Sequence, residues 1–380
     1  MKILQVIGGG EKGGSRNYLL TLTEELRARG FDVEIACFLE DVVADSARKK
    51  SIPVTVFPMK SLFDIKVIAQ LKKYILERGF DVVHTHGVRA NFVGRLAARK
   101  INIPVVTTVH SSIYHDYSHP LKKLFYHRIE KLTRPFTDHF IAVAGSLKQE
   151  LEQDGIPPER IDVVYNGLSP SFAFEAPTSS LRAELGIDEK LPILMTIGRL
   201  EAVKNQALLL QIWATLYKQL DFCGVIVGDG PLRQELEEQA RTLGIADRVH
   251  FLGFRNDIYS LLTQADVFIL TSNMEGLPIT LLESMAGRTP VVVSKVGGMP
   301  EVIDMAKNGY TVPAGDVEQF AARIQEIIRQ PELKERLGEQ GYETLMKHFT
   351  GETFIQNTIQ IYNKVTQFSE DSSSGKGGKS

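Results

Sequence analysis

The chain has 380 residues, of which 43% are apolar and 24% charged, proportions typical of a soluble globular protein with material for two domains. A formal net charge of −2 excludes a strongly basic nucleic-acid-binding protein, and we expect no nucleic-acid partner. No apolar run is long enough to span a membrane and the first residues lack a signal-peptide pattern, so we expect a cytoplasmic protein.

Short apolar runs alternate with amphipathic stretches through the first half of the chain. The runs are rich in β-branched residues and bounded by Gly, Pro, Asp or Asn, which is typical of strands. Most are continuously apolar, as expected for parallel strands covered on both faces. The predicted strands are 3–7, 33–38, 54–57, 82–84, 105–110, 140–144 and 163–165.

The segment 166–180 is dense in Gly, Pro and Ser and is predicted to be a linker. The alternation then resumes. The predicted strands of this second series are 193–197, 225–227, 249–252, 267–270, 291–293 and 310–312. Two consecutive series of alternating strands and helices predict an α/β chain with two Rossmann-like, doubly wound domains.

A glycine-rich turn, residues 8–14, follows the first strand and contains the spacing G-x-G-x-x-G. A dehydrogenase would need an acid that closes the second strand, and Glu34 inside it and Glu40 beyond it are poorly placed for that role. Two alternatives remain. The turn requires glycine for its own conformation, or Gly13 and Gly14 bring a helix N-terminus close to a phosphate or a sugar.

Two cations, Arg199 and Lys204, flank the turn between the first strand of the second series and its helix. Arginine binds phosphate oxygens bidentately and lysine acts as a point charge, so this pair suits a pyrophosphate. The alternative is a pair of solvated surface cations.

Two acids follow a later strand, Glu275 in a loop and Glu283 in the next helix. A carboxylate readily accepts two hydroxyl hydrogen bonds, so Glu275 suits the hydroxyls of a sugar and Glu283 a ribose diol. The amides of Gly276 and Leu277 precede the helix and are free to bind oxygen. The alternative, a surface acid and a half-buried helical acid, is weakened by the two cations at another strand end of the same sheet.

Together these motifs resemble family 4 of the glycosyltransferases, which has the GT-B fold of two Rossmann-like domains facing across a cleft. The residues that carry the resemblance are Gly13-Gly14, His110, Gly198-Arg199-Leu200, Lys204, Glu275, Glu283 and the segments 228–232, 251–253 and 297–301. The loop residues Asn273 and Met274 lie where relatives vary with the donor, so they leave the sugar open.

The resemblance implies retaining transfer of a hexose or N-acetylhexosamine from a nucleotide sugar to a saccharide or lipid-linked acceptor. UDP-linked donors are preferred to GDP-linked ones on family frequency alone. In the front-face mechanism of such enzymes, the leaving phosphate helps to deprotonate the acceptor and no enzyme nucleophile takes part. The absence of an obvious carboxylate pair for double displacement agrees with this mechanism.

The resemblance also implies roles for single residues. Arg199 and Lys204 would neutralise the donor diphosphate, and Glu283 would bind the ribose. Glu275 would bind the transferred sugar, His110 would touch that sugar and the diphosphate, and Phe254 would lie near the base. The predicted catalytic set is His110, Glu275, Arg199 and Lys204. The predicted donor-binding set is Gly13, Gly14, Arg199, Lys204, Phe254, Gly276, Leu277 and Glu283.

No Asp-x-Asp sequence occurs that would hold a divalent metal on the diphosphate. We therefore expect metal-independent transfer with no cofactor besides the donor. His84, His86 and His110 could suggest zinc, but their spacing matches no standard zinc motif. His84 and His86 are predicted to be structural or acceptor-side residues. The predicted acceptor-side set is Arg16, His84, His86, Arg89 and Asn91, and the loops 87–91 and 111–119 are expected to contribute contacts.

The segment 119–134 has a helical period with five basic residues against one acid. Residues 1–168 also carry more basic than acidic residues, whereas the remainder carries the reverse. The helix is expected either to pack against the core with a basic solvated face or to lie on an anionic bilayer. The second alternative would place the enzyme peripherally on the inner face of the membrane.

The expected domains are residues 1–167 and 168–350, followed by a helix at about 351–368 that crosses back to the first domain, as the resemblance implies. The low-complexity end, 369–380, is expected to be disordered. Three other functions stay open: a nucleotide-sugar epimerase on a similar fold, a non-catalytic nucleotide-binding protein, and a dehydrogenase.

Overall fold

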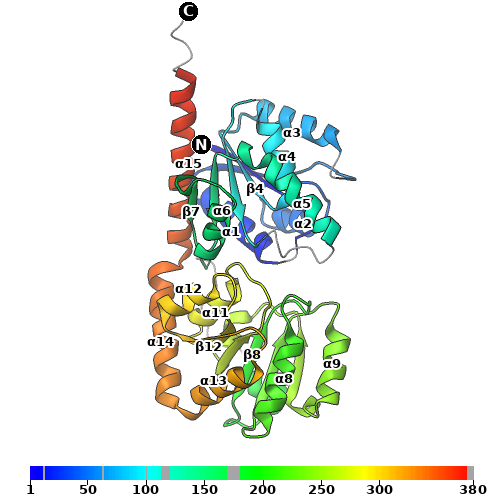
Figure 1. The fold of residues 1–380 in the computed structure, drawn as a ribbon, viewed down its shortest axis with the longest axis vertical. Helices are drawn as coiled ribbons and strands as arrows, with labels where there is room; N and C mark the ends of the chain where they lie inside the picture. The colour runs from blue at the N-terminus through cyan, green and yellow to red at the C-terminus, as the bar shows by residue number, and fades with distance from the viewer. Residues whose placement is uncertain (12, 62–63, 100, 113–119, 169–179, 375–380) are drawn as a thin grey trace, which may run out of the picture. The chain divides into compact units, whose positions relative to one another are not determined.

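The computed structural model of the chain (Figure 1) describes all residues except 12, 62–63, 100, 113–119, 169–179 and 375–380. Side chains are also left undescribed at 120–123 and 368–374. The chain forms two compact units, one from Met1–Asn166 with Gly351–Ser380 and the other from Gly167–Thr350. Parts of the predicted linker, the predicted acceptor loop 111–119 and the end of the predicted tail lie outside the described residues.

Unit 1 is built on a seven-stranded parallel sheet of order β3-β2-β1-β4-β5-β6-β7. Its strands are β1 (Lys2–Ile7), β2 (Asp32–Cys37), β3 (Val54–Val56), β4 (Val82–His86), β5 (Val105–Val109), β6 (His139–Ala142) and β7 (Ile161–Val163). Its α-helices are α1 (Gly14–Ala28), α2 (Val42–Lys49), α3 (Ile65–Arg78), α4 (Val88–Ala98), α5 (Pro120–Thr133), α6 (Gly145–Gln153) and α15 (Gly351–Ser374).

Both faces of this sheet are covered, which explains why its strands are apolar without alternation. The side chains of α3 and α4 pack with Leu4, Val6 and Val83 on one face. Those of α1 and α2 pack with Ile7 and Ile35 on the other. The predicted seventh strand, 163–165, differs from β7 because residues 161–163 form the pairs with β6.

Unit 2 is built on a six-stranded parallel sheet of order β10-β9-β8-β11-β12-β13. Its strands are β8 (Ile193–Ile197), β9 (Cys223–Val227), β10 (Val249–Gly253), β11 (Val267–Leu270), β12 (Val291–Ser294) and β13 (Gly309–Val312). Its α-helices are α7 (Leu181–Leu185), α8 (Gln206–Tyr217), α9 (Arg233–Thr242), α10 (Ile258–Leu262), α11 (Ile279–Ala286), α12 (Met299–Ala306), α13 (Val317–Arg329) and α14 (Pro331–His348).

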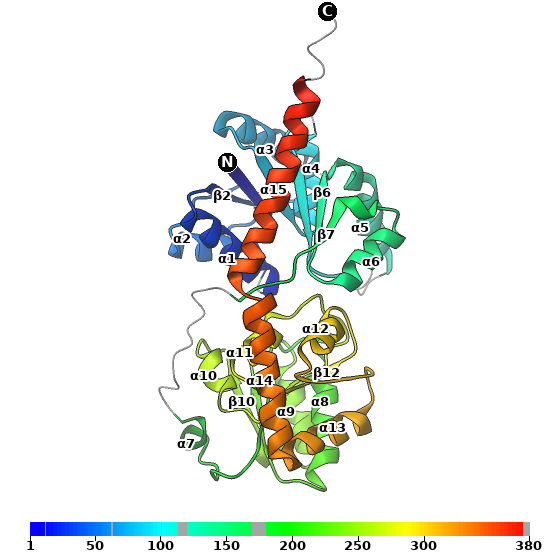
Figure 2. The same ribbon diagram turned by 90° about the vertical axis from the view of Figure 1, so that its left-hand side faces the viewer.

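The last helix, α15, returns to unit 1 and runs along it beside α1 (Figure 2). Phe354, Ile355, Ile361 and Tyr362 are buried there, so this helix completes the core of unit 1. It continues to Ser374, past the predicted end at about 368. A helix that is already formed can be extended at little cost, because only its nucleation is unfavourable.

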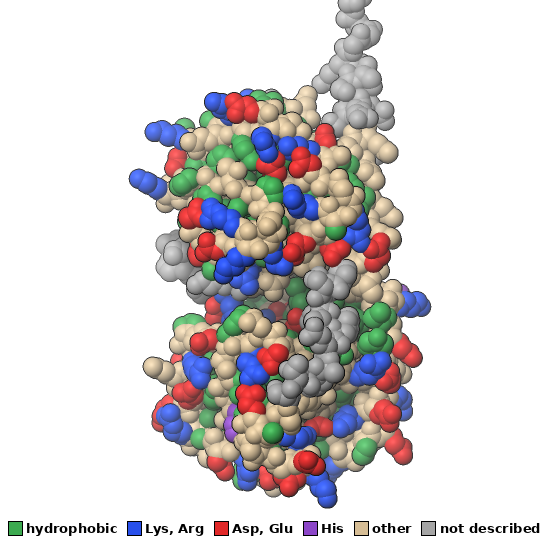
Figure 3. Space-filling model, turned by 180° about the vertical axis from the view of Figure 1, so that it is seen from behind, with side chains coloured by type: hydrophobic (Ala, Val, Ile, Leu, Met, Phe, Trp, Pro, Cys, Tyr) green, Lys and Arg blue, Asp and Glu red, His purple; other side chains and the backbone are tan. Residues whose placement is uncertain are grey.

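Each sheet reverses its strand order once, between β1 and β4 in unit 1 and between β8 and β11 in unit 2. Loops at the carboxyl ends of the two strands diverge at such a point and leave a crevice for a ligand. On the face of the molecule in Figure 3, basic and acidic side chains are interspersed over both units rather than gathered by sign. The two reversal points are therefore the places where a ligand is expected to bind.

Candidate functional site

The reversal point of unit 2 carries both predicted cations. Arg199 follows β8 and its guanidinium pairs with Glu201 at 2.8 Å, with the Arg199 side chain about half exposed. Lys204 lies at the end of the same turn, and its Nζ donates to Glu275 Oε1 at 2.6 Å. Asn205 then adopts a left-handed conformation with φ of 50° and its side chain caps α8.

The loop after β9 packs against the backbone of this turn. Gly228 has φ of 130°, and a Cβ placed there would collide with the carbonyl oxygen of Gly198. A Cβ at Gly230 would likewise collide with the carbonyl of Leu200. Leu200 N donates to Asp229 O at 3.0 Å. The two glycines therefore allow the close backbone contact that holds the Arg199 turn in place.

Glu275 lies in the loop after β11, with a side chain that is 9% exposed. Its Oε1 accepts hydrogen bonds from both Lys204 Nζ and Ser272 Oγ, each at 2.6 Å. Gly297, with φ of 57°, passes so close that a Cβ would meet the backbone oxygen of Glu275. Gly298 N also donates to Gly276 O at 2.7 Å, so the segment 297–298 fixes the Glu275 loop.

Further polar contacts join the two loops, and the sequence did not predict them. Thr271 Oγ1 donates to Asn205 O at 2.9 Å, and Asn273 N donates to Val203 O at 2.8 Å. Asn205 Nδ2 donates to Asn273 Oδ1 at 3.0 Å. Asn273 thus fixes the spacing of the Lys204 and Glu275 loops. A short polar residue in the loop that follows a strand was the only signal of such a role.

Glu283 is a partly buried acid, and no partner for it is found among the described residues. It lies in α11, whose N-terminus follows Pro278 and has no side-chain cap. Within the described part of the chain its carboxyl group makes no hydrogen bond or ion pair, and burial raises its pKa to about 7. Leu277 lies just before the N-cap residue Pro278, and its side chain is buried.

Phe254 follows β10 and leaves 74% of its side chain exposed. A large exposed aromatic ring at a strand end is available for contact with a flat ligand group. Gly276, whose carbonyl holds Gly298, lies between Glu275 and the start of α11. Unit 2 therefore gathers the predicted cations, both acids and the uncapped helix N-terminus around one reversal point.

The reversal point of unit 1 contains a cavity of about 400 Å³. Its lining includes Gly8, Gly10, Glu11, His86, Gly87, Arg89, Asn91, His110, Tyr126 and Glu130. Arg89 is at the start of α4 and forms no hydrogen bond or ion pair with a described residue. The structure thus brings together His86, Arg89, Asn91 and His110 from the predicted sets.

The glycine-rich turn of unit 1 contacts its own acid. Gly9 N donates to Glu11 Oε2 at 2.7 Å. Gly13 caps α1, and a Cβ at Gly14 would meet no atom within 4 Å, so the start of α1 faces open space. Arg16 lies in the first turn of this helix and donates to Asn17 Oδ1.

The acids that a dinucleotide site would use are occupied elsewhere. Glu34 is buried and forms ion pairs with Lys2 and Arg78. Glu40 pairs with Arg48. Neither carboxylate is left to bind a ribose at the end of β2, so the geometry does not support the dehydrogenase alternative.

The three histidines differ in their surroundings. His84 is completely buried, and its ring nitrogens contact Tyr362 Oη at 2.6 Å and Thr108 Oγ1 at 2.7 Å. Of the two alternatives for His84, structural or acceptor-side, this burial favours the structural one. His86 Nδ1 and His110 Nε2 lie 3.1 Å apart. Burial lowers the pKa of His84 to about 3 and that of His110 to about 4, so both are neutral at pH 7.

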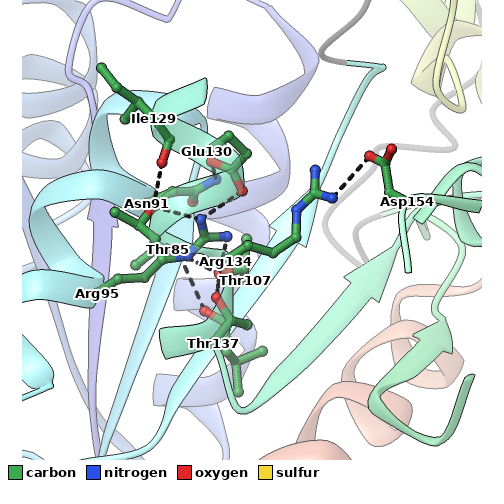
Figure 4. A network of polar contacts seen from close by, with 11 residues as sticks. Thr85, Asn91, Arg95, Thr107, Ile129, Glu130, Arg134, Thr137 and Asp154 are labelled. Carbon is green, nitrogen blue, oxygen red and sulfur yellow. Dashed lines mark hydrogen bonds and ion pairs between the residues drawn. The ribbon is translucent and has the colours of Figure 1, made fainter. Parts of the chain in front are cut away.

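A buried ion pair joins Glu130, which lines the cavity, to Arg95 of α4 (Figure 4). Arg95 Nη1 and Glu130 Oε1 are 2.6 Å apart, and both side chains are almost fully buried. Asn91 Nδ2 donates to Glu130 Oε2 at 3.2 Å, while Asn91 Oδ1 is buried and finds no partner among the described residues. The role of Glu130 was missed. Its only signal in the sequence is that it is the single acid on a basic helix.

The outer face of α5 is apolar as well as basic. Leu124, Phe125 and Leu132 are 50%, 38% and 73% exposed. Arg128 and Lys131 are exposed beside them. The apolar residues that give segment 119–134 its helical period do not form the packed face. Of Leu124, Phe125, Ile129 and Leu132 only Ile129 is buried, because Glu130 and Thr133 occupy the inner side of α5.

No helix in the described part of the chain is both long and apolar enough to cross a bilayer. Among the described residues, no three His, Cys, Asp or Glu side chains are grouped so as to hold a metal ion.

Comparisons with known proteins place these features in a family. The description "Glycosyltransferase Family 4" matches residues 12–172, and "Glycosyl transferases group 1" matches residues 178–344. The N-acetyl-alpha-D-glucosaminyl L-malate synthase of Bacillus anthracis is 29% identical over 83% of this chain and 82% of its own length. The alpha-D-kanosaminyltransferase of Streptomyces kanamyceticus is 30% identical over 68% of this chain and 70% of its own.

Among solved structures, that of Anabaena Alr3699/HepE in complex with UDP is similar, with a TM-score of 0.83 and 25% identity. The match covers 96% of this chain and 100% of that one. This similarity confirms the predicted GT-B fold.

Proposed function

Because the chain belongs to glycosyltransferase family 4 and is a glycosyltransferase, we propose that it transfers a hexose or N-acetylhexosamine from a UDP-linked donor with retention. The acceptor is a saccharide or lipid-linked molecule. Because the chain belongs to this family, we set aside the three alternatives of an epimerase, a dehydrogenase and a non-catalytic protein. The observation that carries the proposal is the grouping of Arg199, Lys204, Glu275 and Glu283 around one reversal point.

The donor binds to unit 2 through complementary charges. Arg199 and Lys204 neutralise the diphosphate, which also approaches the uncapped N-terminus of α11. Lys204 turns from Glu275 towards a phosphate oxygen, and the released Glu275 accepts a hydroxyl of the transferred sugar. The unpartnered Glu283 accepts hydrogen bonds from the ribose hydroxyls, and Phe254 lies against the base.

A UDP-linked donor is supported by the similarity to the Anabaena protein, whose structure holds UDP. We prefer it to a GDP-linked donor on this ground. The choice of a hexose or N-acetylhexosamine rests on the family alone, because the loop residues beside Glu275 leave the sugar open.

Transfer takes place on one face of the sugar. The bond between the anomeric carbon and the leaving phosphate oxygen breaks, the acceptor oxygen bonds to the same face, and the acceptor proton passes to the leaving phosphate. Arg199 and Lys204 stabilise the charge that develops on the phosphate. The enzyme thus needs no nucleophile of its own, and no metal where two cations already neutralise the leaving group. Full activity in EDTA is the expected result, and its loss would contradict the metal-independent proposal.

The acceptor binds in the cavity of unit 1. Arg89, which has no partner among the described residues, offers a cation, and the polar side chains of Asn91 and Glu130 line the same cavity. His86 and His110 line the same cavity. This set suits a molecule with several hydroxyl groups and an anionic group.

The outer face of α5 is proposed to contact an anionic membrane. Leu124, Phe125 and Leu132 would enter the interface, with Arg128 and Lys131 at the level of the headgroups. The inner face of the same helix lines the acceptor cavity through Tyr126 and Glu130. This placement favours an acceptor carried by the membrane and a peripheral location on its inner face.

The test is nucleotide binding measured by thermal shift and calorimetry with UDP, GDP, ADP and NAD. We expect stabilisation by UDP that is lost in Arg199→Ala and in Glu283→Ala, because each removes a ligand contact. The matched control is Arg241→Ala, which removes an exposed arginine that pairs with Glu238 on α9. Stabilisation by GDP or NAD in place of UDP, or equal UDP binding in the site variants, would contradict the assignment.

A further inference from the structure

A continuous chain of hydrogen bonds runs from His110 to the C-terminal helix. His110 Nε2 contacts His86 Nδ1 at 3.1 Å, and this contact is partly buried at the edge of the cavity. His86 Nε2 contacts Gln5 Oε1 at 2.7 Å, and Gln5 Nε2 then donates to Tyr362 Oη at 3.1 Å. Gln5 and Tyr362 are fully buried and His86 is 1% exposed, so water does not compete for the bonds among these three residues.

Each bond in this chain determines the proton position of the next. An amide oxygen only accepts, so His86 Nε2 carries the hydrogen that it donates to Gln5. A neutral imidazole has one N–H, and burial lowers the pKa of His86 well below its usual value. His86 Nδ1 is therefore an acceptor. It follows that His110 Nε2 carries a hydrogen and His110 Nδ1 holds a lone pair.

Tyr362 sets the orientation of the Gln5 amide. Gln5 Nε2 donates to its hydroxyl oxygen, which directs the amide oxygen of Gln5 to His86. The same hydroxyl lies 2.6 Å from His84 Nδ1, where either group can be the donor. When a neutral His84 accepts at Nδ1, the hydroxyl gives its single hydrogen there and has none for the amide oxygen of Gln5. His84 Nε2 in turn contacts Thr108 Oγ1 at 2.7 Å, which anchors this end of the chain in β5.

The ring of His110 is also held by packing. Tyr18 meets it edge to face, with ring centroids 4.7 Å apart. Tyr18 is itself buried and hydrogen-bonded to Thr108 Oγ1 at 3.2 Å. Rotation of the His110 ring would break its contact with His86. Among the described residues nothing hydrogen-bonds to His110 Nδ1, and His110 lines the cavity of unit 1.

We propose that Tyr362, Gln5 and His86 are positioning residues that hold His110 in its Nε2–H tautomer, with Nδ1 presented as an acceptor for a sugar hydroxyl. This inference rests on the proposed function, because that function brings a sugar to His110. It also narrows the predicted role of His110. A lone pair attracts a hydroxyl and repels a phosphate oxygen, so His110 contacts the sugar and not the diphosphate.

The first experiment is NMR of the full chain labelled with ¹⁵N-histidine, with His110 assigned through His110→Ala. We expect the His110 ring to be protonated on Nε2 at neutral pH. In Tyr362→Phe, which keeps the buried ring, we expect a mixture of the two tautomers. The matched control is Tyr310→Phe, which removes a hydroxyl bonded to Glu326 in unit 2 and leaves the His110 signals unchanged.

The second experiment measures transfer from the UDP-sugar. Tyr362→Phe is expected to lower kcat/KM about tenfold, the loss of one positioned hydrogen bond, with the Kd for UDP unchanged. In His110→Ala the Tyr362→Phe substitution should have no further effect. His86→Asn, which keeps an acceptor oxygen near the position of Nδ1, should retain more activity than His86→Leu.

A wild-type His110 protonated on Nδ1 overturns the proposal without any variant. So does an unchanged tautomer in Tyr362→Phe. Tautomers as expected but full transfer activity in His110→Ala also overturn it, because His110 then contacts no reacting sugar. Failure of UDP to bind the wild-type chain is distinct: it contradicts the proposed function, while the NMR result still decides the state of the hydrogen-bond chain.

Discussion

At the scale of one residue, Glu283 is a carboxyl group whose charged form is destabilised by burial. Its carboxyl group is desolvated without a compensating partner in the described chain, and its pKa rises from 4.5 to about 7. A folded-state pKa above the unfolded value means that the folded chain binds the proton more tightly. Folding stability therefore falls as the pH rises from about 4.5 to about 7. Hydroxyl donors from a ribose would supply the missing partners.

Nucleotide affinity should depend on the protonation of Glu283. The carboxylate accepts two hydroxyl hydrogen bonds, whereas the protonated acid offers fewer acceptor positions. We expect the Kd for UDP to rise as the pH falls below about 7, by up to about tenfold per pH unit, and to be constant above it. Calorimetric titrations across this range measure the effect.

The control for this prediction is Glu283→Gln. It should bind UDP more weakly, without the pH dependence, and should melt a few degrees higher in the absence of nucleotide because no charge is buried. A Kd in the wild type that is independent of pH, or the same pH dependence in Glu283→Gln, would refute the role of this carboxyl group.

Substitution of Gly297 should weaken donor binding by displacing the backbone of Glu275. Gly297→Ala would push the backbone of Glu275 and disturb its contact with Lys204. We expect UDP-sugar binding to weaken about tenfold or more, measured by calorimetry. Gly315→Ala is the matched control, since Gly315 also has positive φ but open space around its Cβ position. Equal effects of the two substitutions on binding would mean that only backbone strain matters.

At the scale of one element, α5 uses its two faces differently. The inner face holds Glu130 and Thr133 against Arg95 of α4, so the helix is fixed in rotation by a buried ion pair. That rotation turns Leu124 and Leu132 outward. An apolar helical period normally predicts a packed face. Here the apolar residues form an exposed surface, because the ion pair of Glu130 with Arg95 occupies the inner side of the helix.

Removal of the exposed leucines should release the chain from membranes. We expect the wild type to float with vesicles that contain anionic lipid and not with neutral vesicles. Leu124→Ser with Leu132→Ser should reduce the bound fraction about tenfold, because two apolar contacts with the interface are lost. Leu76→Ser, at an exposed leucine of α3, is the control. Equal flotation of all variants, or equal recovery with neutral lipid, would contradict the proposed surface.

At the scale of the whole molecule, unit 1 is completed by a segment that follows unit 2 in the chain. Phe354, Ile355 and Tyr362 of α15 are buried in unit 1, and Tyr362 reaches Gln5 at the other end of the sequence. Unit 1 therefore cannot complete its core until the chain has passed through unit 2.

Removal of α15 should destabilise unit 1 and leave the stability of unit 2 unchanged. A chain that ends at residue 352 loses the buried face of α15, so the unfolding transition of unit 1 should be lost or shifted strongly to lower temperature. A chain that ends at residue 367 keeps that face and should unfold like the full chain. Calorimetry with and without UDP tests this, and the stabilisation by UDP should persist in the shorter chain. Normal unfolding of the chain ending at residue 352 would show that α15 is dispensable.

The sequence by itself determined the features that depend on neighbouring residues. Apolar runs bounded by turn residues located the strands, and the unbroken apolar character of those runs identified parallel sheets covered on both faces. Arg199, Lys204 and Glu275 were predicted because they lie in turns after strands, where a parallel sheet binds ligands, and Glu283 because it lies in the helix that follows such a turn. The family resemblance of these motifs was confirmed by the comparisons.

Only the tertiary structure decided which distant residues meet and how deeply they are buried. Lys204 and Glu275 pair across 71 positions, and Gln5 meets Tyr362 across 357. Periodicity shows that a face is covered but not which element covers it, so neither pair was predictable. The same limit applied to the outward turn of α5 and to the pKa of Glu283, because both follow from the packing of several elements at once.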